Sequence, residues 1–246
     1  MLLVAQSESA LPTKIAFLTD GAGRSNQCRS GTPTRILPQR MFDSDLEAAA
    51  VAFFSEVFER HAKNAADAYA VGLYIDFEGE DVRRPVVTAG FNSQAGIDAA
   101  LARWPGMFQR RRVPADAEEA RWNFAFWTHN DLARFGDPDE NPDGATALER
   151  WIRLNGWWYT DEEEETADLG RMLGLGDEIQ AGLDRVMTVV ARELQREAIP
   201  QALGRSIPVL LHGPVYDSTF AVAARKANPP GLVEDFAAWA ERQDLE

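Results

Sequence analysis

Apolar residues recur every three or four positions in several long segments of the chain. One such stripe runs from Leu46 to about Ala62, and another closes the chain between Leu232 and Trp239. The longest uninterrupted stripe consists of Ile179, Leu183, Val186, Met187, Val190 and Leu194. Because an α-helix brings such positions to one face, the spacing predicts helices that each bury one side.

Polar residues next to these stripes predict where the helices begin and end. The predicted N-terminal caps are Ser44, Ser93, Thr146, Thr160 and Asp217. Three of them are followed three residues later by glutamate, which is the capping box that satisfies backbone N–H groups of a first helical turn. Gly174 and Gly176 are predicted to interrupt the helix that begins after Thr160, because glycine disfavours a helix interior.

Short segments rich in β-branched and aromatic residues predict strands at 68–76, 85–91, 121–128 and 207–213. The short acidic loop between the first two predicts an antiparallel hairpin. The third alternates aromatic residues, although Trp122 and Trp127 could also belong to a helical turn. Strands and helices follow one another without a regular βαβ rhythm. The sequence therefore predicts an α+β fold with a small, mainly antiparallel sheet covered by helices.

Residues 1–40 differ in composition from the rest. They are rich in Gly, Ser, Thr, Pro and Arg, lack helical or strand periodicity, and contain five basic and two acidic residues. We predict a mostly disordered leader over 1–40 and a single α+β domain over 41–246. Two alternatives stay open, namely a short strand or helix at 14–20 and a true start at Met41.

Charge and composition exclude several classes of function. The 246 residues contain 25 basic and 39 acidic side chains, a net charge of −14. Such a surface repels nucleic acids and anionic membranes, and favours a basic protein partner. The single cysteine excludes an internal disulfide, and the apolar runs are too short to span a membrane. Cytoplasmic location is the expectation, and no cofactor is predicted.

The three histidines carry the only hint of catalysis. His61 ends a predicted helix, where a cation favours the helix dipole, and His129 lies in a predicted loop or helix cap. His212 ends a buried strand, and the nearby Tyr216 and Asp217 could share a cleft with it at the sheet edge. These three residues are the alternative site, in which the protein is an enzyme or a small-molecule binder.

An acidic run with adjacent aromatic residues predicts a protein interface. Residues 161–165 read DEEEE and follow Thr160, so they also fit the start of a helix, where the dipole favours negative charge. The preceding Trp157-Trp158-Tyr159 point to different sides of any regular element, which predicts at least one exposed ring. We predict a partner-binding face at Trp157, Trp158, Glu164 and Glu165.

A calcium loop is a third hypothesis. With Asp139 at position 1, Asn141, Asp143 and Gly144 fall at positions 3, 5 and 6 of an EF-type loop. Position 12, however, is Arg150 where the loop needs a bidentate glutamate. The sequence therefore predicts no metal site.

From about Asp43 to Trp239 the chain resembles the bacterial domain-of-unknown-function family DUF4303. The resemblance rests on the YAVGLYID strand, the segment from Arg121 to Trp127, and the closing IPVLLHG and Asn228-Pro-Pro motifs. The family has no assigned activity, so it implies no catalytic residues. Similar small acidic α+β proteins occur among bacterial immunity proteins. The expected function is a non-catalytic interaction module that binds a basic partner. An immunity-type inhibitor is one form that such a module could take.

Overall fold

The sheet is built from four strands in the order β3-β2-β1-β4. The computed structural model describes residues 40–77, 81–102, 114–214 and 216–243, which belong to one compact unit. The strands are β1 (Ala68–Phe77), β2 (Pro85–Ser93), β3 (His129–Phe135) and β4 (Val209–His212). β2 pairs antiparallel with both β1 and β3, whereas β4 runs parallel to β1. The predicted hairpin and the α+β class are confirmed, while the predictions for residues 1–39 lie outside the described residues.

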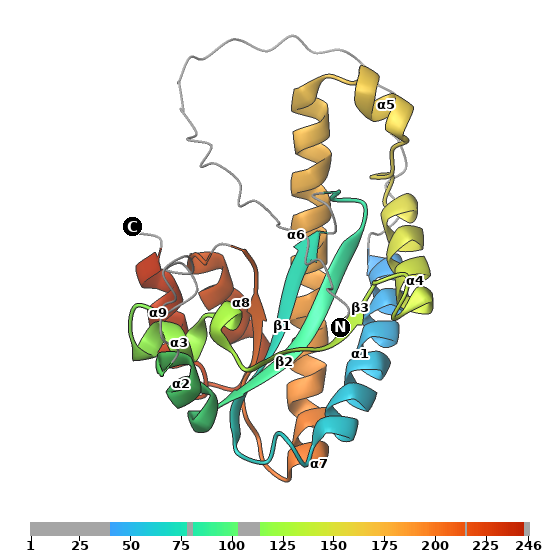
Figure 1. Cartoon of the computed structure of the whole chain (residues 1–246). Coiled ribbons are helices and arrows are strands. Elements are labelled where there is room, and N and C mark those ends of the chain that lie inside the picture. Colours follow the sequence, from blue (N-terminus) through green and yellow to red (C-terminus); the bar gives the residue numbers. More distant parts are fainter. Residues whose placement is uncertain (1–39, 78–80, 103–113, 215, 244–246) are drawn as a thin grey trace, which may run out of the picture. The chain divides into compact units, whose positions relative to one another are not determined.

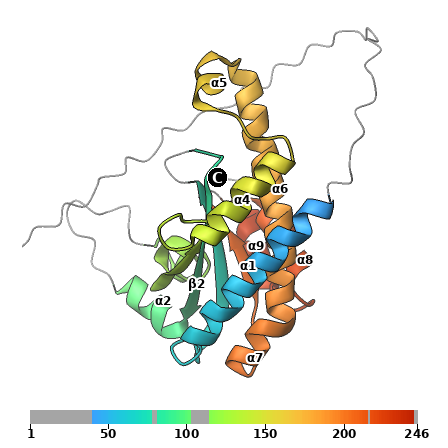
Figure 2. The same cartoon turned by 90° about the vertical axis from the view of Figure 1, so that its right-hand side faces the viewer.

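Helices pack on both faces of this sheet (Figures 1 and 2). They are α1 (Arg40–His61), α2 (Gln94–Leu101), α3 (Ala117–Trp122), α4 (Pro142–Leu154), α5 (Asp161–Thr166), α6 (Leu169–Glu193), α7 (Ile199–Leu203), α8 (Ser218–Ala227) and α9 (Glu234–Gln243). A 3₁₀-helix, η3 (Phe124–Phe126), precedes β3, and a π-helical turn, η4 (Leu194–Ala198), joins α6 to α7.

Alternation along the strands separates two cores. Val71, Leu73 and Ile75 of β1 face the larger core, where α1, α4 and α6 cover the sheet. Ala70 and Leu210 face the opposite side and pack against α3, α8 and α9. Because successive side chains of a strand point to opposite faces, both sides of the central strands are buried and their sequences are almost continuously apolar.

Two helix starts differ from the sequence predictions. Ser44 and Thr146 are not caps, because α1 and α4 begin four residues earlier, at Arg40 and Pro142. In α1 the added turn is held from outside, since Asp43 accepts a hydrogen bond from Trp151 Nε1 at 2.8 Å. Thr146 instead donates its hydroxyl to the carbonyl of Pro142. The predicted caps Ser93, Thr160 and Asp217 are confirmed, each accepting a backbone N–H.

In the segment 121–131, the observed secondary structure is the opposite of the predicted one. The predicted strand 121–128 consists of the end of α3 and of η3, whereas His129, expected in a loop, begins β3. Asn123 accepts the N–H of Ala125, and the N–H of Phe124 is bound by Tyr216 from α8. These partners satisfy the backbone without a neighbouring strand. Gly174 and Gly176 do not end a helix either, because α6 continues through both.

Candidate partner-binding surface

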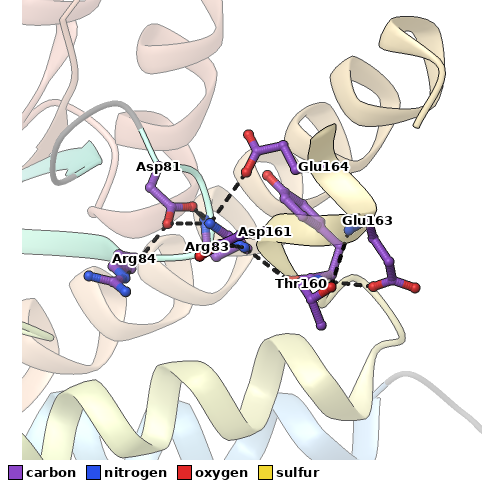
Figure 3. A network of polar contacts seen from close by, with 8 residues as sticks. Asp81, Arg83, Arg84, Thr160, Asp161, Glu163 and Glu164 are labelled. Carbon is purple, nitrogen blue, oxygen red and sulfur yellow. Dashed lines mark hydrogen bonds and ion pairs between the residues drawn. The ribbon is translucent and has the colours of Figure 1, made fainter. Parts of the chain in front are cut away.

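A nearly buried arginine positions the acidic helix α5 (Figure 3). Arg83 precedes β2, and its side chain is 9% exposed. Asp81 accepts three hydrogen bonds from it, one from the backbone N–H and two from the guanidinium, at 2.8–2.9 Å. Nη1 also donates to the carbonyl of Tyr159 at 3.0 Å and pairs with Asp161 at 2.8 Å, and Nη2 lies 3.4 Å from Glu164. One cation therefore binds the loop before β2 to the start of α5.

The electrostatics of this network favour the charged forms. Burial acts to raise the pKa of Asp81, but the hydrogen bonds from Arg83 outweigh it and hold that pKa below its ordinary value. The hydrogen bond to Asp81 likewise raises the pKa of Arg83. Thr160 completes the junction, because its hydroxyl accepts the N–H of Glu163 while Glu163 accepts the N–H of Thr160. The short helix is thus fixed at its N-terminal end.

The aromatic residues before α5 are mostly buried. Trp157 packs edge-on against Trp151, with ring centroids 5.1 Å apart, and donates its indole N–H to Glu178 of α6 at 2.5 Å. Tyr159 is also buried and lies under the guanidinium of Arg83. Trp158 is half-buried, with the guanidinium of Arg153 3.7 Å from its ring centroid. Of the predicted partner face, Trp157 therefore anchors α6 in the core, and Trp158 keeps partial exposure.

Beyond these anchors, α5 and the first turns of α6 extend past the ends of the strands (Figures 1 and 2). We call residues 160–178 the acidic arm, because it contains eight acidic residues and one basic residue. All the side chains from Asp161 to Glu165 are exposed. Glu164 pairs with Arg83, whereas Glu165 has no ion pair among the described residues. Leu173 of α6 adds an apolar side chain that is 58% exposed.

The alternative site is closed to solvent at its centre. His212 is 0% exposed and lies among the rings of Phe124, Trp127, Tyr216 and Phe236, with centroids 4.9–5.8 Å away. Its ring packs on Gly72, where an added Cβ would lie 2.9 Å from Nε2. Only a glycine leaves this space. The structure brings His212 and Tyr216 together but not Asp217, whose carboxylate caps α8 through the N–H of Thr219.

The chemistry of His212 is that of a neutral core residue. Its Nδ1 lies 2.9 Å from the hydroxyl of Tyr216, which also accepts the N–H of Phe124 at 2.9 Å. Nε2 is buried and has no hydrogen-bond partner among the described residues. Burial lowers the pKa of His212 to about 3 and raises the pKa of Tyr216. Because the ring is fully buried, a substrate at the surface could not contact either ring nitrogen directly.

An open cavity of about 430 Å³ lies beside this cluster rather than at it. Tyr74 and Phe124, stacked with centroids 5.3 Å apart, form part of its wall, and Arg134 is the only cation among the described residues that line it. That guanidinium is already bound by Asp131 in a bidentate pair at 3.0 and 3.1 Å. The described part of the lining therefore offers no unpaired cation for an anionic ligand.

Comparisons with family models, with curated proteins and with solved structures gave no match. The resemblance to DUF4303 stays a prediction. The function is therefore inferred from the geometry of the chain itself.

Sequence reasoning missed Arg83, the residue that organises the acidic surface. It lies next to Arg84 in a polar loop, and nothing in its local sequence distinguishes the two. Only the fold separates them, since Arg83 is nearly buried whereas the Arg84 side chain is 69% exposed and lies 3.6 Å from Asp81. The available signal was the acidic run at 161–165, which implied a cation nearby without indicating which one.

The residues of the hypothetical calcium loop do not form a loop around a possible ion site. Pro142 opens α4, so Asp143 and Gly144 lie in its first turn and not in a loop that could wrap an ion. Arg150 lies 3.9 Å from Asp45 of α1. Among the described residues no group of three or more His, Cys, Asp or Glu side chains is arranged to hold a metal.

No helix in the described part of the chain is both long enough and apolar enough to cross a membrane.

Proposed function

We propose that this protein is an interaction module that binds a basic protein partner through the acidic arm and acts without catalysis. The observation that carries the proposal is the arrangement around Arg83. A single nearly buried cation fixes the base of α5, while Glu162, Glu163 and Glu165 remain exposed on it. The helix that carries these carboxylates is thus held in place before a partner arrives, which reduces the ordering cost of binding.

The chemistry of the arm is suited to recognition of positive charge. Its net charge of −7 is half of the charge of the whole chain. Such a concentrated field accelerates encounter with an oppositely charged protein and selects against acidic ones. Leu173, exposed on the same arm, provides apolar surface that a partner would remove from water.

The enzyme hypothesis has weaker support. A general acid or base must come within hydrogen-bond reach of its substrate. His212 is sealed by four aromatic rings and Gly72, and Asp217 serves as a helix cap. The residues of the alternative site are therefore used in packing and capping.

The proposal is tested by reversing charge on the arm. The full chain would be used to capture its partner from a lysate of the source organism, and the association rate would then be measured with purified partner. Glu162→Lys combined with Glu165→Lys should fold normally, since neither side chain is buried. We expect the association rate at low salt to fall at least tenfold, and the difference to shrink at high salt as charges are screened.

The matched control is Asp139→Lys combined with Glu140→Lys. It makes the same change in net charge at two exposed residues before α4. We expect at most a twofold decrease in rate. Equal effects of both double variants would show that only net charge matters. An acidic partner, or no captured protein at all, would also refute the acidic arm as the binding surface.

A further inference from the structure

A second acidic surface lies between α1 and the continuous helical segment α6-η4-α7. It is an open groove of about 660 Å³. Its lining consists of Ser44, Glu47, Ala48, Val51, Ala52, Ser55 and Glu59 of α1, with Val189, Glu193, Glu197, Ala198, Gln201 and Ala202 opposite. None of these residues belongs to the acidic arm, so the groove is a separate surface.

The floor of the groove is made of small side chains. On α1 the lining residues recur at three- and four-residue spacing, which places them on one face beside the core-facing stripe of Leu46, Ala50 and Phe54. Ala48 and Ala52 are exposed, and Ala198 and Ala202 are half-buried on the opposite wall. Small residues let a second backbone approach closely, because no long side chain keeps it at a distance.

The dimensions favour an elongated occupant. Ser44 and Glu59 are fifteen residues apart on α1, so the groove follows that helix for about 22 Å at a rise of 1.5 Å per residue. A compact small molecule would fill only part of such a length. A partner helix of about four turns would match it from end to end.

The charges of the groove select a basic occupant. Four glutamates line it, Glu47, Glu59, Glu193 and Glu197, and no lysine or arginine of the described residues does. Burial and the nearby Asp43 and Glu193 raise the pKa of Glu47, although the nearby Arg192 lowers it in part. Two arginines outside the lining offset part of this charge. Arg196 forms ion pairs with Glu193 and Glu197, and Arg192 lies 3.8 Å from Glu193, whereas Glu47 and Glu59 have no ion pair among the described residues.

The helix that forms one wall departs from α-helical geometry at this site. The π-helical turn η4 lies between α6 and α7, and both Glu197 and Ala198 of the lining belong to it. Pro200 follows and has no N–H to donate to the carbonyl of Arg196, which accounts for the altered hydrogen bonding. Such turns are rare and frequently occur at functional sites. Here the π-helical turn itself supplies two residues of the wall, Glu197 and Ala198.

We infer that this groove binds a basic amphipathic helix of a partner protein, with small apolar residues of that helix against the alanine floor and its Lys or Arg side chains beside the four glutamates. Helices that dock in grooves commonly bring residues at i, i+3, i+4 and i+7 into contact. A nucleic acid would be repelled by the glutamates, and a second copy of this chain would bring a further charge of −14. The inference does not rest on the acidic arm.

The test uses a defined probe, an 18-residue fluorescein-labelled helical peptide with Ala and Leu on one face and Lys on the other. Its affinity for the full chain would be measured by fluorescence anisotropy. Ala52→Trp fills the groove at an exposed position, and we expect it to raise Kd at least tenfold. Glu47→Gln combined with Glu59→Gln should raise Kd at least fivefold at low salt and less at high salt.

Three controls separate the groove from general charge effects. Glu56→Trp places the same side chain on α1 at an exposed residue outside the groove and should leave Kd unchanged. A peptide of the same composition with a scrambled, non-amphipathic order should bind at least tenfold more weakly. The arm variant Glu162→Lys with Glu165→Lys should also bind the peptide normally. Circular dichroism verifies that each variant is folded.

Several results would overturn the inference. These are absence of peptide binding, equal binding of the scrambled peptide, and a Kd that Ala52→Trp leaves unchanged. If only the arm variant weakens binding, the peptide binds the arm, so the groove inference fails while the proposed function stands. If sedimentation shows a dimer that Ala52→Trp dissociates, the occupant is a second copy and the inference is wrong.

Discussion

Acid should destabilise this protein through His212. The imidazole is fully buried, and burial lowers its pKa from 6.5 to about 3. In the unfolded chain the same ring is in water and takes up a proton near its ordinary pKa. Between these two values the unfolded state binds one more proton than the folded state. The free energy of unfolding therefore falls by about 1.4 kcal/mol for each pH unit of acidification in this range.

The magnitude follows from the two pKa values. Acidification from pH 7 to pH 4.5 crosses the unfolded-state value of 6.5 and stays above the folded-state value of about 3. Integrated over this interval, His212 alone removes about 2–3 kcal/mol of stability. Asp81 acts in the same direction, because its lowered pKa gives stability at neutral pH that is lost in acid. Asp184 opposes both, since burial raises its pKa and the folded state gains its proton first.

A variant without the ring isolates the contribution of His212. His212→Phe keeps an aromatic ring among Phe124, Trp127 and Phe236 but cannot titrate. Urea unfolding followed by tryptophan fluorescence at pH 7, 6, 5 and 4.5 gives the stability of both proteins. We expect the wild type to lose about 2–3 kcal/mol more than the variant over this range. Parallel pH profiles would refute the reasoning and show that His212 can be protonated inside the fold.

Three further predictions concern stability. Arg83→Gln should lower the free energy of unfolding by about 2–4 kcal/mol, because it removes the guanidinium that binds Asp81 and the carbonyl of Tyr159. Hydrogen exchange should increase in α5, and unchanged exchange would contradict this. Gly182→Ala should lower the free energy of unfolding by about 1–3 kcal/mol in urea titrations, since the added Cβ would lie 2.7 Å from Trp157. Gly174→Ala is the control, because an added Cβ there has no neighbour within 4 Å, and it should raise the free energy of unfolding by about 0.5–1 kcal/mol. Millimolar calcium should leave Tm unchanged, and a rise that disappears in Asp139→Ala would disprove this.

Some features of the fold were evident in the sequence because their causes are local. Ser93, Thr160 and Asp217 bind backbone N–H groups two or three residues away, so a short sequence window contains the whole interaction. The same holds for the β1–β2 hairpin, in which a short loop joins two apolar strands. The acidic run of α5 was likewise visible as a helix start, because its capping box lies within four residues.

Tertiary structure alone decided the rest. The segment RWNFAFWT alternates like a strand, yet Tyr216, 92 residues away, binds the N–H of Phe124 and holds a 3₁₀ turn. The polar segment from His129 to Phe135 becomes a strand because the open edge of β2 supplies its hydrogen bonds. Arg83 acquires its role from Tyr159 and Asp161, more than 70 residues distant. A residue's sequence neighbours determine which local hydrogen bonds it can make, but only the folded chain determines which distant groups satisfy the others.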